Sequence, residues 1–254
     1  MYQKNQSLLM KVQKINITDS AVFISDLHLT HDANNNLFLN FLRHASDLTN
    51  NLFILGDLFD YWIGDDSRMY EDEIKALKEI GTQKKIYFIH GNRDFLINKK
   101  YFKKNNITIL DDETKISLGN HQILLMHGDI LCSDDHDYQD FRKKVRSKKW
   151  RSHFLAKELK DRIQIANDLR EQSTKSNLNK PENITDVSEE TVISIIEKNY
   201  PVDVLIHGHT HRQNIHKYKE SVAFTRFVLG DWHENIGNYL LWTEDKDFQF
   251  KTFS

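Results

Sequence analysis

Six short clusters of histidine, aspartate and asparagine follow one another along this chain and together could hold metal ions. They are Asp26-Leu27-His28, Gly56-Asp57, Gly91-Asn92-Arg93-Asp94, His127-Gly128-Asp129, His207-Gly208-His209 and the following Thr210-His211. Most of them come directly after a short apolar run rich in β-branched residues, so the polar side chains are expected where strands end and loops begin. This pattern indicates a hydrolytic site with two metal ions.

The spacing inside the clusters lets two side chains reach one ion. Asp26 and His28 are two residues apart at a strand end, so their side chains point to the same face, and His207 and His209 have the same spacing. Asp57 can offer its two carboxylate oxygens to two different cations. With carboxylate, amide and imidazole donors and no sulfur, the set suits Mn, Fe or Zn better than a soft metal.

A pair of divalent cations predicts a class of reaction. Two such ions held ~3.5 to 4 Å apart lower the pKa of a shared water and stabilise the attacking and leaving oxygens in phosphoryl transfer. The expected reaction is therefore hydrolysis of a phosphoester or a phosphoanhydride. The sequence has no Gly-x-Ser-x-Gly elbow, Walker-type loop or dinucleotide fingerprint, which gives nucleophilic side-chain catalysis little support. Asp94 and Asp129 are expected to orient ligands or loop backbone.

Composition narrows the class of protein. Hydrophobic residues make up 39% and charged residues 28% of the 254 residues, which is ordinary globular usage. No stretch approaches the ~18 apolar residues of a membrane-spanning helix, and the first 20 residues lack the apolar core of a signal peptide, so we expect a cytoplasmic protein. Cys132 is the only cysteine, which excludes an intramolecular disulfide and a thiolate metal cage. The net charge of −2 gives no global attraction to nucleic acid.

The elements that must position these clusters can be read from the apolar pattern. Strands are expected at 21–25, 51–55, 86–90, 107–110, 115–118, 122–126, 202–207, 223–229 and 239–242, with helices near 37–45 and 74–80. Strand signals stop between residues 133 and 200, where apolar spacing predicts two or three helices and one more around 192–196. We expect one α/β core, residues 1–132 and 201–254, made of two packed sheets, and a helical insertion at 133–200.

The ordered set Asp-x-His, Gly-Asp, Gly-Asn-x-Asp, His-Gly-Asp and Gly-His-x-His resembles the calcineurin-like metallophosphoesterase superfamily over residues 21 to 233. The resemblance implies a four-layer αββα sandwich with a dinuclear centre at the strand ends, an insertion that covers the site as a lid, and Mn as the expected metal. It also implies the ligands of each ion. One ion takes Asp26, His28, Asp57 and His209, and the other takes Asp57, Asn92, His127 and His207.

Finer details are similar to one branch of that superfamily, which hydrolyses the diphosphate of UDP-2,3-diacylglucosamine in lipid A biosynthesis. The matching stretches are 24–29, 56–59, 62–66, 89–96 and 207–212, and the run Trp62-Ile63-Gly64-Asp65-Asp66 is especially specific to the branch. The resemblance implies attack of a metal-bridging hydroxide on the α-phosphorus, releasing UMP and 2,3-diacylglucosamine 1-phosphate. It implies substrate contacts at Asn92, Arg93, Asp135, Ser173, Asn177, Lys180 and His207.

Arg93 departs from the wider superfamily, where this position is commonly a histidine thought to protonate the leaving group. Arginine cannot do so near neutral pH, because its pKa exceeds ~12. A diphosphate does not need it, since the departing group is a phosphate monoester with a second pKa near ~6. We therefore expect Arg93, with Asn92, to act in catalysis by clamping phosphate charge. The alternative is a salt bridge between Arg93 and Asp94 or another acid.

The insertion carries a basic stretch. Between Arg142 and Arg162 there are ten Lys or Arg residues, counting both ends, against only Glu158 and Asp161, with aromatic residues among them. A nucleic-acid patch, a solvated helix face and an interfacial membrane helix all fit this composition. An acylated substrate favours the membrane, so we expect peripheral association with anionic lipid on the cytoplasmic face of the inner membrane.

Two other functions remain open from the sequence. A general nucleotide or nucleic-acid phosphodiesterase would use the same metal chemistry on soluble substrates. A non-catalytic scaffold would have kept the sandwich and lost the metals, but all seven predicted positions hold competent ligands. The length of the insertion and Arg93 argue against a general nuclease, so we expect an enzyme that acts as a monomer and has no nucleic-acid partner.

Overall fold

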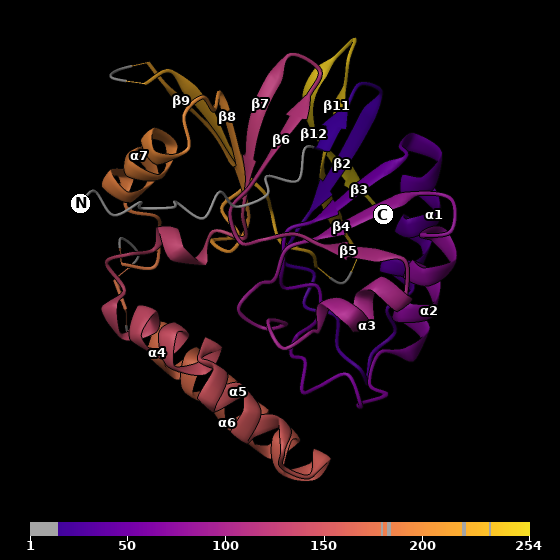
Figure 1. Cartoon of the computed structure of the whole chain (residues 1–254), viewed down its shortest axis with the longest axis vertical. Coiled ribbons are helices and arrows are strands. Elements are labelled where there is room, and N and C mark those ends of the chain that lie inside the picture. The colour runs from indigo at the N-terminus through magenta and orange to yellow at the C-terminus, as the bar shows by residue number, and fades with distance from the viewer. Residues whose placement is uncertain (1–14, 179, 182–183, 220–221, 234) are drawn as a thin grey trace, which may run out of the picture.

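Two sheets pack face to face with helices outside them (Figure 1). The structure is a computed structural model that describes residues 15–178, 180–181, 184–219, 222–233 and 235–254. One sheet has the order β1 (Ile15–Ile17), β6 (Thr114–Leu118), β7 (His121–Leu125), β8 (Val204–His207), β10 (Phe224–Val228) and β9 (Asn214–Tyr218). The other has the order β12 (Asp247–Phe253), β11 (Gly237–Thr243), β2 (Ser20–Ile24), β3 (Asn51–Ile54), β4 (Lys85–Phe88) and β5 (Ile107–Ile109).

The middle of each sheet is parallel. Strands β2, β3, β4 and β5 run parallel to one another in the second sheet, and β7, β8 and β10 do so in the first. Every residue of β3 and β8 is buried, which explains why each strand has a run of three apolar residues instead of an alternating pattern. The parallel arrangement brings the carboxyl ends of several strands to one end of the sandwich.

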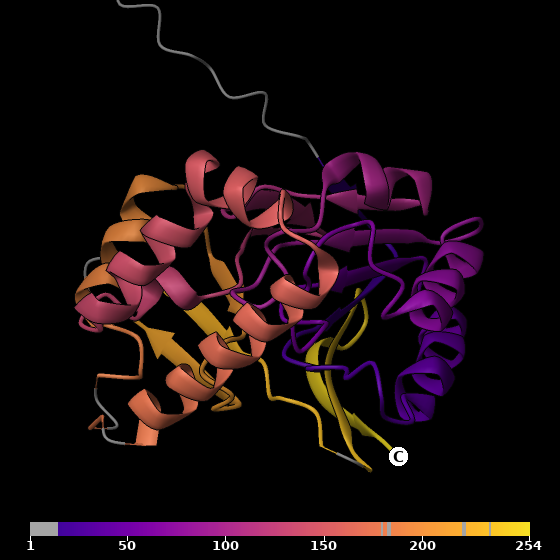
Figure 2. The same cartoon turned by 90° about the horizontal axis from the view of Figure 1, so that it is seen from below.

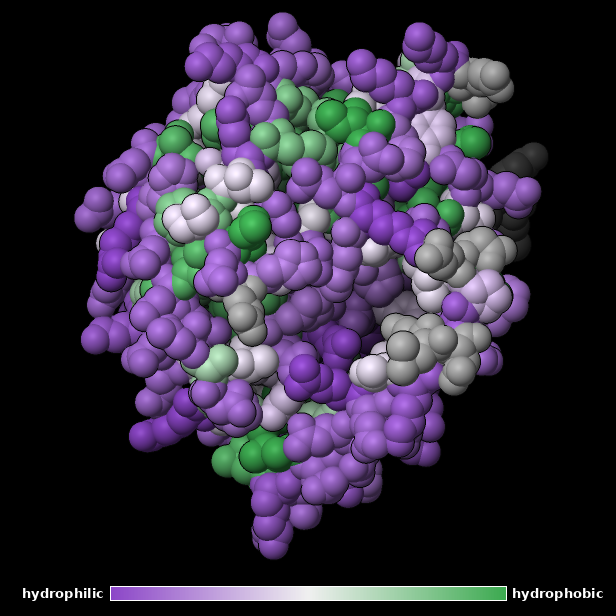
Figure 3. All heavy atoms as spheres, turned by 180° about the vertical axis from the view of Figure 1, so that it is seen from behind, coloured by the Kyte–Doolittle hydropathy of each residue, from purple (hydrophilic) through white to green (hydrophobic). Residues whose placement is uncertain are grey.

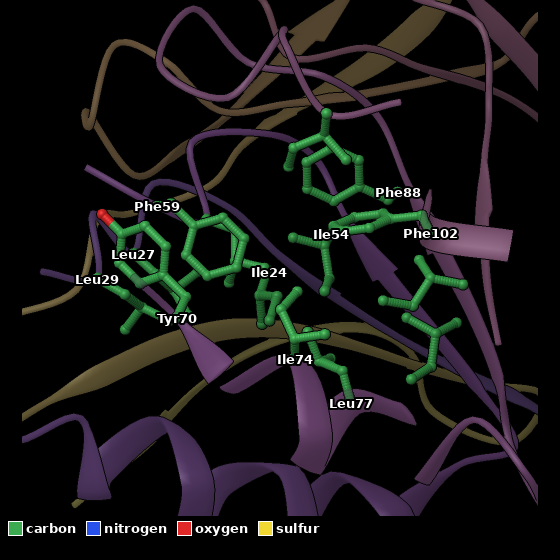
Figure 4. Packing of buried hydrophobic residues seen from close by; sticks show 14 of the residues in the cluster. Ile24, Leu27, Leu29, Ile54, Phe59, Tyr70, Ile74, Leu77, Phe88 and Phe102 are labelled. Carbon is green, nitrogen blue, oxygen red and sulfur yellow. The ribbon is translucent and has the colours of Figure 1, made fainter. Parts of the chain in front are cut away.

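Alternate side chains of each strand enter different cores. Phe23 and Phe53 stack at 4.9 Å between the two sheets. Their neighbours Ile24 and Ile54 point the other way, toward the helices, where Phe88, Ile74 and Leu77 complete a second cluster (Figure 4). That outer layer contains α1 (Asn36–Leu48), α2 (Glu71–Ile80) and α3 (Lys99–Lys104).

The opposite outer layer is formed by α7 (Glu189–Lys198). Its Val192 and Ile196 pack against Leu124 of β7 and Leu205 of β8, on the face of the first sheet that points away from the second. The order of layers is therefore helix, sheet, sheet, helix, as the αββα prediction required. Helix α7 falls inside the range predicted for the insertion, yet it packs on the sandwich.

Three more helices precede α7 in the chain. They are α4 (His136–Arg146), α5 (Lys148–Leu155) and α6 (Leu159–Leu178), preceded by a short 3₁₀ turn at Asp129–Leu131. Ser147 ends α4 and begins α5, where its hydroxyl accepts a hydrogen bond from the backbone N–H of Trp150 at 3.2 Å. Seen from below, these helices lie across the end of the sandwich (Figure 2). Within the described residues, no helix is both long and apolar enough to cross a membrane.

Candidate metal centre

The loops that follow the central strands bring the predicted clusters together. Asp26 follows β2, Asp57 follows β3, Asn92 follows β4, His127 follows β7, and His207 ends β8. Backbone hydrogen bonds tie these loops to one another. His28 donates its N–H to the carbonyl of Asp57 at 3.0 Å, and Gly208 donates to the carbonyl of His127 at 2.8 Å. The site therefore spans both sheets.

Several predicted ligand atoms converge in this space. The side-chain oxygen of Asn92 lies 3.0 Å from Nε2 of His127 and 2.9 Å from Nδ1 of His209. Nε2 of His127 lies 3.8 Å from a carboxylate oxygen of Asp57. The ligand atoms of Asp26, Asp57 and His127 all lie within 4.8 Å of one another. These five residues surround a common centre.

A second group of possible ligands adjoins the first and contains a residue that was not assigned as a ligand from the sequence. Asp26, His28 and His211 also bring their ligand atoms within 4.8 Å of one another. The two groups share Asp26. His207 belongs to neither group, and its ring has other partners: Nδ1 lies 2.9 Å from the carbonyl of Gly208, and Nε2 lies 3.3 Å from a guanidinium nitrogen of Arg226.

The backbone at this centre is unusual. Left-handed φ angles between 48° and 69° occur at Asp26, His28, Asp57, His209 and His211. Non-glycine residues rarely adopt this region, and each instance costs about 1–3 kcal/mol. Close packing enforces the conformation: a Cβ on Gly91 would lie 2.0 Å from a carboxylate oxygen of Asp57. Such local strain concentrates where function requires a particular side-chain direction.

The donor atoms fit divalent cations. Nδ1 of His28 is buried and has no hydrogen-bond partner among the described residues. Oδ1 of Asp26 is also buried, and its neighbour there is Nε2 of His211 at 3.4 Å, longer than an ordinary hydrogen bond. A buried polar atom without a partner costs about 1–3 kcal/mol, which a bound cation would relieve. Carboxylate, amide and imidazole donors suit Mn, Fe or Zn.

Electrostatics keep three of the four proposed imidazole ligands, His28, His207 and His209, in the neutral form that binds metal. Burial, reinforced by Arg226, lowers the pKa of His207 to about 3, and burial with His127 lowers the pKa of His209 to about 4. Burial also lowers the pKa of His28. Burial opposes ionisation of Asp26, but the neighbouring His211, His127 and His28 hold its pKa below the usual value. Burial would lower the pKa of His127, but Asp57 and Asp26 raise it, so this imidazole would release a proton when a metal binds.

Asp94 has the backbone-orienting role predicted for it. Its two carboxylate oxygens accept hydrogen bonds from the backbone N–H groups of Leu58, at 2.9 Å, and Gly91, at 2.8 Å. The alternative of an Arg93–Asp94 salt bridge is therefore wrong. Arg93 donates its backbone N–H to Asp57 at 2.8 Å, and its guanidinium forms no ion pair with any described residue. It lines a cavity instead.

That cavity lies between the metal loops and the insertion and has a volume of about 260 Å³. Asn92 and Arg93 line it from the core together with Trp62 and Leu96. The insertion contributes mainly apolar and aromatic side chains, among them Phe141, Trp150, Phe154 and Leu169. The end of the cavity that Asn92 and Arg93 line thus continues into an apolar chamber.

The four insertion residues predicted to contact substrate have different surroundings. Ser173 and Lys180 line the cavity. Lys180 also pairs with Asp135, whose carboxylate oxygens lie 2.8 and 2.7 Å from the ammonium. Asp135 in addition caps helix α4 by accepting the backbone N–H of Tyr138 at 3.1 Å. Asn177 belongs to helix α6, and its side chain lies outside the part of the chain that the structure describes.

Sequence reasoning did not assign a role to His211. Its Nε2 lies 3.3 Å from Nε2 of His28, and its Nδ1 lies 3.3 Å from the carboxylate of Asp231. Burial would lower the pKa of His211, but Asp231 and Asp26 raise it to about 10. The signal that could have identified it was its position two residues after His209, at the spacing of the other paired ligands.

Asp129 also binds the insertion. Its carboxylate accepts hydrogen bonds from the Tyr138 hydroxyl at 2.8 Å and from Nε of Arg142 at 2.6 Å. Arg146 of the same helix donates to the carbonyl of Gly91 at 2.8 Å. Helix α4 is thus attached to both metal-binding loops that it approaches.

Comparison with known proteins agrees with this geometry. The family model of the calcineurin-like phosphoesterases matches residues 20–213. A protein from Haemophilus influenzae named UDP-2,3-diacylglucosamine hydrolase is 42% identical over 235 residues, which are 90% of this chain and 97% of the relative. A protein of the same name from Pectobacterium carotovorum is 43% identical over 223 residues, 85% of this chain and 92% of the relative. The match of the family model covers most of the chain, including the strand-end clusters of the sandwich. This chain therefore belongs to the calcineurin-like phosphoesterase family.

Proposed function

We propose that this chain hydrolyses the diphosphate of UDP-2,3-diacylglucosamine to UMP and 2,3-diacylglucosamine 1-phosphate, a step of lipid A biosynthesis. The names of relatives at 42% and 43% identity support this substrate. The main structural support for the proposal is the environment of the Arg93 guanidinium. It has no partner among the described side chains and lies where a metal-binding loop meets an apolar cavity.

The proposed metal ligands are those that the resemblance implied. Asp26, His28, Asp57 and His209 would hold one ion, and Asp57, Asn92, His127 and His207 would hold the other, with Mn as the proposed metal. Two bound divalent cations would supply a water of lowered pKa and neutralise charge on the attacking and leaving oxygens. Buried donors that lack partners, and the convergence of Asn92, His127 and His209, support this assignment.

Arg93 and Asn92 would act on the diphosphate directly. Arg93 would place its planar guanidinium against the phosphate oxygens, where it can form two parallel hydrogen bonds as negative charge develops. No proton donor is required, because the departing sugar 1-phosphate has a second pKa near ~6. His207 would contact the same group from the strand end of β8.

Residues 133–200 would cover the site as an insertion in the core formed by residues 1–132 and 201–254. Asp135, Ser173, Asn177 and Lys180 would contact the polar part of the substrate. The aromatic wall made by Phe141, Trp150 and Phe154 would take the acyl chains, since burying apolar surface is favourable at roughly 25 cal/mol per Å².

The insertion would also bring the enzyme to its substrate at the cytoplasmic face of the inner membrane. Phe141, Leu155 and Leu159 are 38–40% exposed although they are large and apolar. They lie among the basic residues of α4 to α6, which would attract anionic headgroups. Seen from behind, the rest of the insertion is strongly hydrophilic, and a hollow opens beside it (Figure 3). A monomer without a nucleic-acid partner would suffice for this function.

Hydrolysis in oxygen-18 water tests the proposed reaction. Water that attacks the α-phosphorus leaves its oxygen on UMP, so mass spectrometry should find the label in UMP and none in 2,3-diacylglucosamine 1-phosphate. Label in the lipid product would overturn the site of attack. Failure to release either product in the presence of Mn would overturn the proposed substrate.

A further inference from the structure

The run Trp62-Ile63-Gly64-Asp65-Asp66 is not explained by metal or phosphate chemistry. Trp62 lines the cavity, but neither Asp65 nor Asp66 does. Asp65 stays within the core, where its carboxylate accepts hydrogen bonds from Nε1 of Trp62 at 3.1 Å and from the backbone N–H of Asn98 at 3.3 Å. Asp66 binds a residue nearly a hundred positions away.

That residue is Arg162 of helix α6. Its Nη1 and Nη2 donate to the two carboxylate oxygens of Asp66 at 2.8 and 2.5 Å, a two-pronged pairing that suits the planar guanidinium. Nη1 also donates to the carbonyl of Ile63 at 2.7 Å, and Nε donates to the carbonyl of Lys157 at 3.0 Å. The guanidinium thus joins the core run to the insertion.

The burial of the two partners is unequal. The Arg162 side chain is 4% exposed, whereas that of Asp66 is 60% exposed. A buried charge is tolerated only when it is paired and its hydrogen bonds are satisfied. Without the run of residues 62–66, the Arg162 guanidinium would be buried and unpaired. Without Arg162, the carboxylate of Asp66 would still be solvated.

Gly64 shapes the place where Arg162 enters. Its φ of +138° belongs to a region that side chains rarely adopt. An added Cβ would lie 2.3 Å from Nη1 of Arg162 and 3.1 Å from a methyl group of Leu155. Any side chain at position 64 would therefore displace the guanidinium.

This contact lies next to the apolar wall of the cavity. Trp150 and Phe154 of α5 stack at 4.8 Å, and Phe154 is buried in the core cluster that contains Trp62. Arg170, two turns after Arg162 on the same face of α6, lies 2.6 Å from Asp60. Helix α6 is thus held to the core along the side that borders the cavity.

Resting on the proposed function, we propose that Asp66 and Arg162 are positioning residues that dock helix α6 onto the core and thereby set the width of the acyl-chain cavity. They touch neither the metals nor the reacting phosphate. Their effect is on binding of the acylated substrate, with little on the chemical step.

The test compares Asp66→Asn and Arg162→Met with Arg162→Lys in the full chain. We expect the KM for UDP-2,3-diacylglucosamine to rise about tenfold in the first two variants, since charge-assisted hydrogen bonds are lost. The kcat and the Mn content should stay within about twofold of the parent protein, because the metal loops are untouched. Arg162→Lys keeps the charge but not the paired geometry, so its KM should be intermediate.

Hydrogen exchange of helices α5 and α6 provides a readout that needs no substrate. Exchange should accelerate there in Asp66→Asn and should not change in Glu158→Gln. The control removes the pair between Glu158 and Lys160, which lies wholly within the insertion at 3.4 Å, with both side chains more than 75% exposed. Because the Asp66 side chain is exposed, we expect Asp66→Asn to fold. It therefore still tests the inference if Arg162→Met does not fold.

Two results would overturn the inference. One is parental KM and parental exchange in Asp66→Asn, and the other is a fall in kcat accompanied by loss of Mn. If the parent protein itself fails to turn over UDP-2,3-diacylglucosamine, the proposed function fails, and the exchange experiment still decides whether these residues dock the helix.

Discussion

Arg93 is the residue whose chemistry most restricts the reaction. It stands beside Asn92 with its guanidinium directed to the cavity, and the acid that could have neutralised it, Asp94, is occupied by two backbone N–H groups. A permanently charged group at this position suits an anionic leaving group and cannot supply a proton to it. The side chain therefore favours a diphosphate over an alkyl phosphodiester.

Replacing Arg93 with Ala should lower kcat by about 10²–10³-fold, the effect of removing one donor to developing negative charge. Metal content should not change, because the guanidinium contacts none of the proposed ligands. Arg93→Lys should recover part of the activity, since it restores the charge without the planar fork. Kinetics combined with elemental analysis checks this, and Mn lost from Arg93→Ala would reassign the residue to metal binding.

His211 is expected to support the metal centre through Asp26 and His28. His211→Gln should weaken Mn binding about 10–100-fold, the usual effect of removing a group that orients a ligand. His233→Gln is the matched control, because His233 also approaches Asp231, at 3.6 Å, but is 68% exposed and has no recorded contact with Asp26. Titration with Mn followed by electron paramagnetic resonance compares them. Equal affinities in the two variants would remove His211 from the centre.

At the scale of elements, the sequence predicted strands best where both faces are covered. Strands β3 and β8 are wholly buried, and each contains three consecutive apolar residues. Strands β9 and β12 were not predicted, since they lie at sheet edges and are mostly exposed or half-buried, which leaves no alternation to detect. Helix α3 is only six residues long and buries Phe102 alone, too little for a helical period.

The position of a residue relative to the apolar runs also decides which parts of the site could be predicted from the sequence. Residues directly after apolar runs could be placed at strand ends from sequence alone, as with Asp26 and Asp57. The contact of Arg226 with His207 could not, because it depends on β10 lying beside β8 in one particular register. Nor could the pairing of Asp135 with Lys180, which joins the start of α4 to the segment that follows α6.

Asp135 gives a prediction at this scale because it both caps α4 and pairs with Lys180. Asp135→Ala should lower the free energy of unfolding by about 1 kcal/mol through the lost cap. Asp135→Ser can still cap the helix but, like Asp135→Ala, loses the ion pair with Lys180, so it should be about 1 kcal/mol more stable than Asp135→Ala and less stable than the parent. Urea unfolding distinguishes them. Equal stability of the Ala and Ser variants would show that the cap contributes nothing.

In the whole molecule, the sandwich and the insertion contribute different parts of the site. The two sheets meet at the loops that carry the proposed metal ligands, while the insertion adds apolar residues to the cavity wall and basic and apolar residues to the surface. This arrangement fits an enzyme whose substrate has a charged end in water and acyl chains in a bilayer.

Association with anionic vesicles should therefore fall as salt rises, because exposed charges are screened beyond about 10 Å at 0.1 M ionic strength. A variant with Lys148, Lys149 and Arg151 changed to Glu should bind less at low salt, while turnover of substrate dispersed in detergent should be retained. Vesicle co-sedimentation measures the first and a product assay the second. Binding that does not depend on salt would contradict the electrostatic part of the proposal.

We propose that a dinuclear centre in this chain acts on a diphosphate that carries acyl chains. The most direct measurement is turnover of UDP-2,3-diacylglucosamine and of a simple soluble phosphodiester by the same protein, with Mn added and after its removal by chelation. We predict rapid, Mn-dependent release of UMP from the first substrate and much slower hydrolysis of the second. Preferential hydrolysis of the soluble phosphodiester, or turnover that survives complete metal removal, would contradict it.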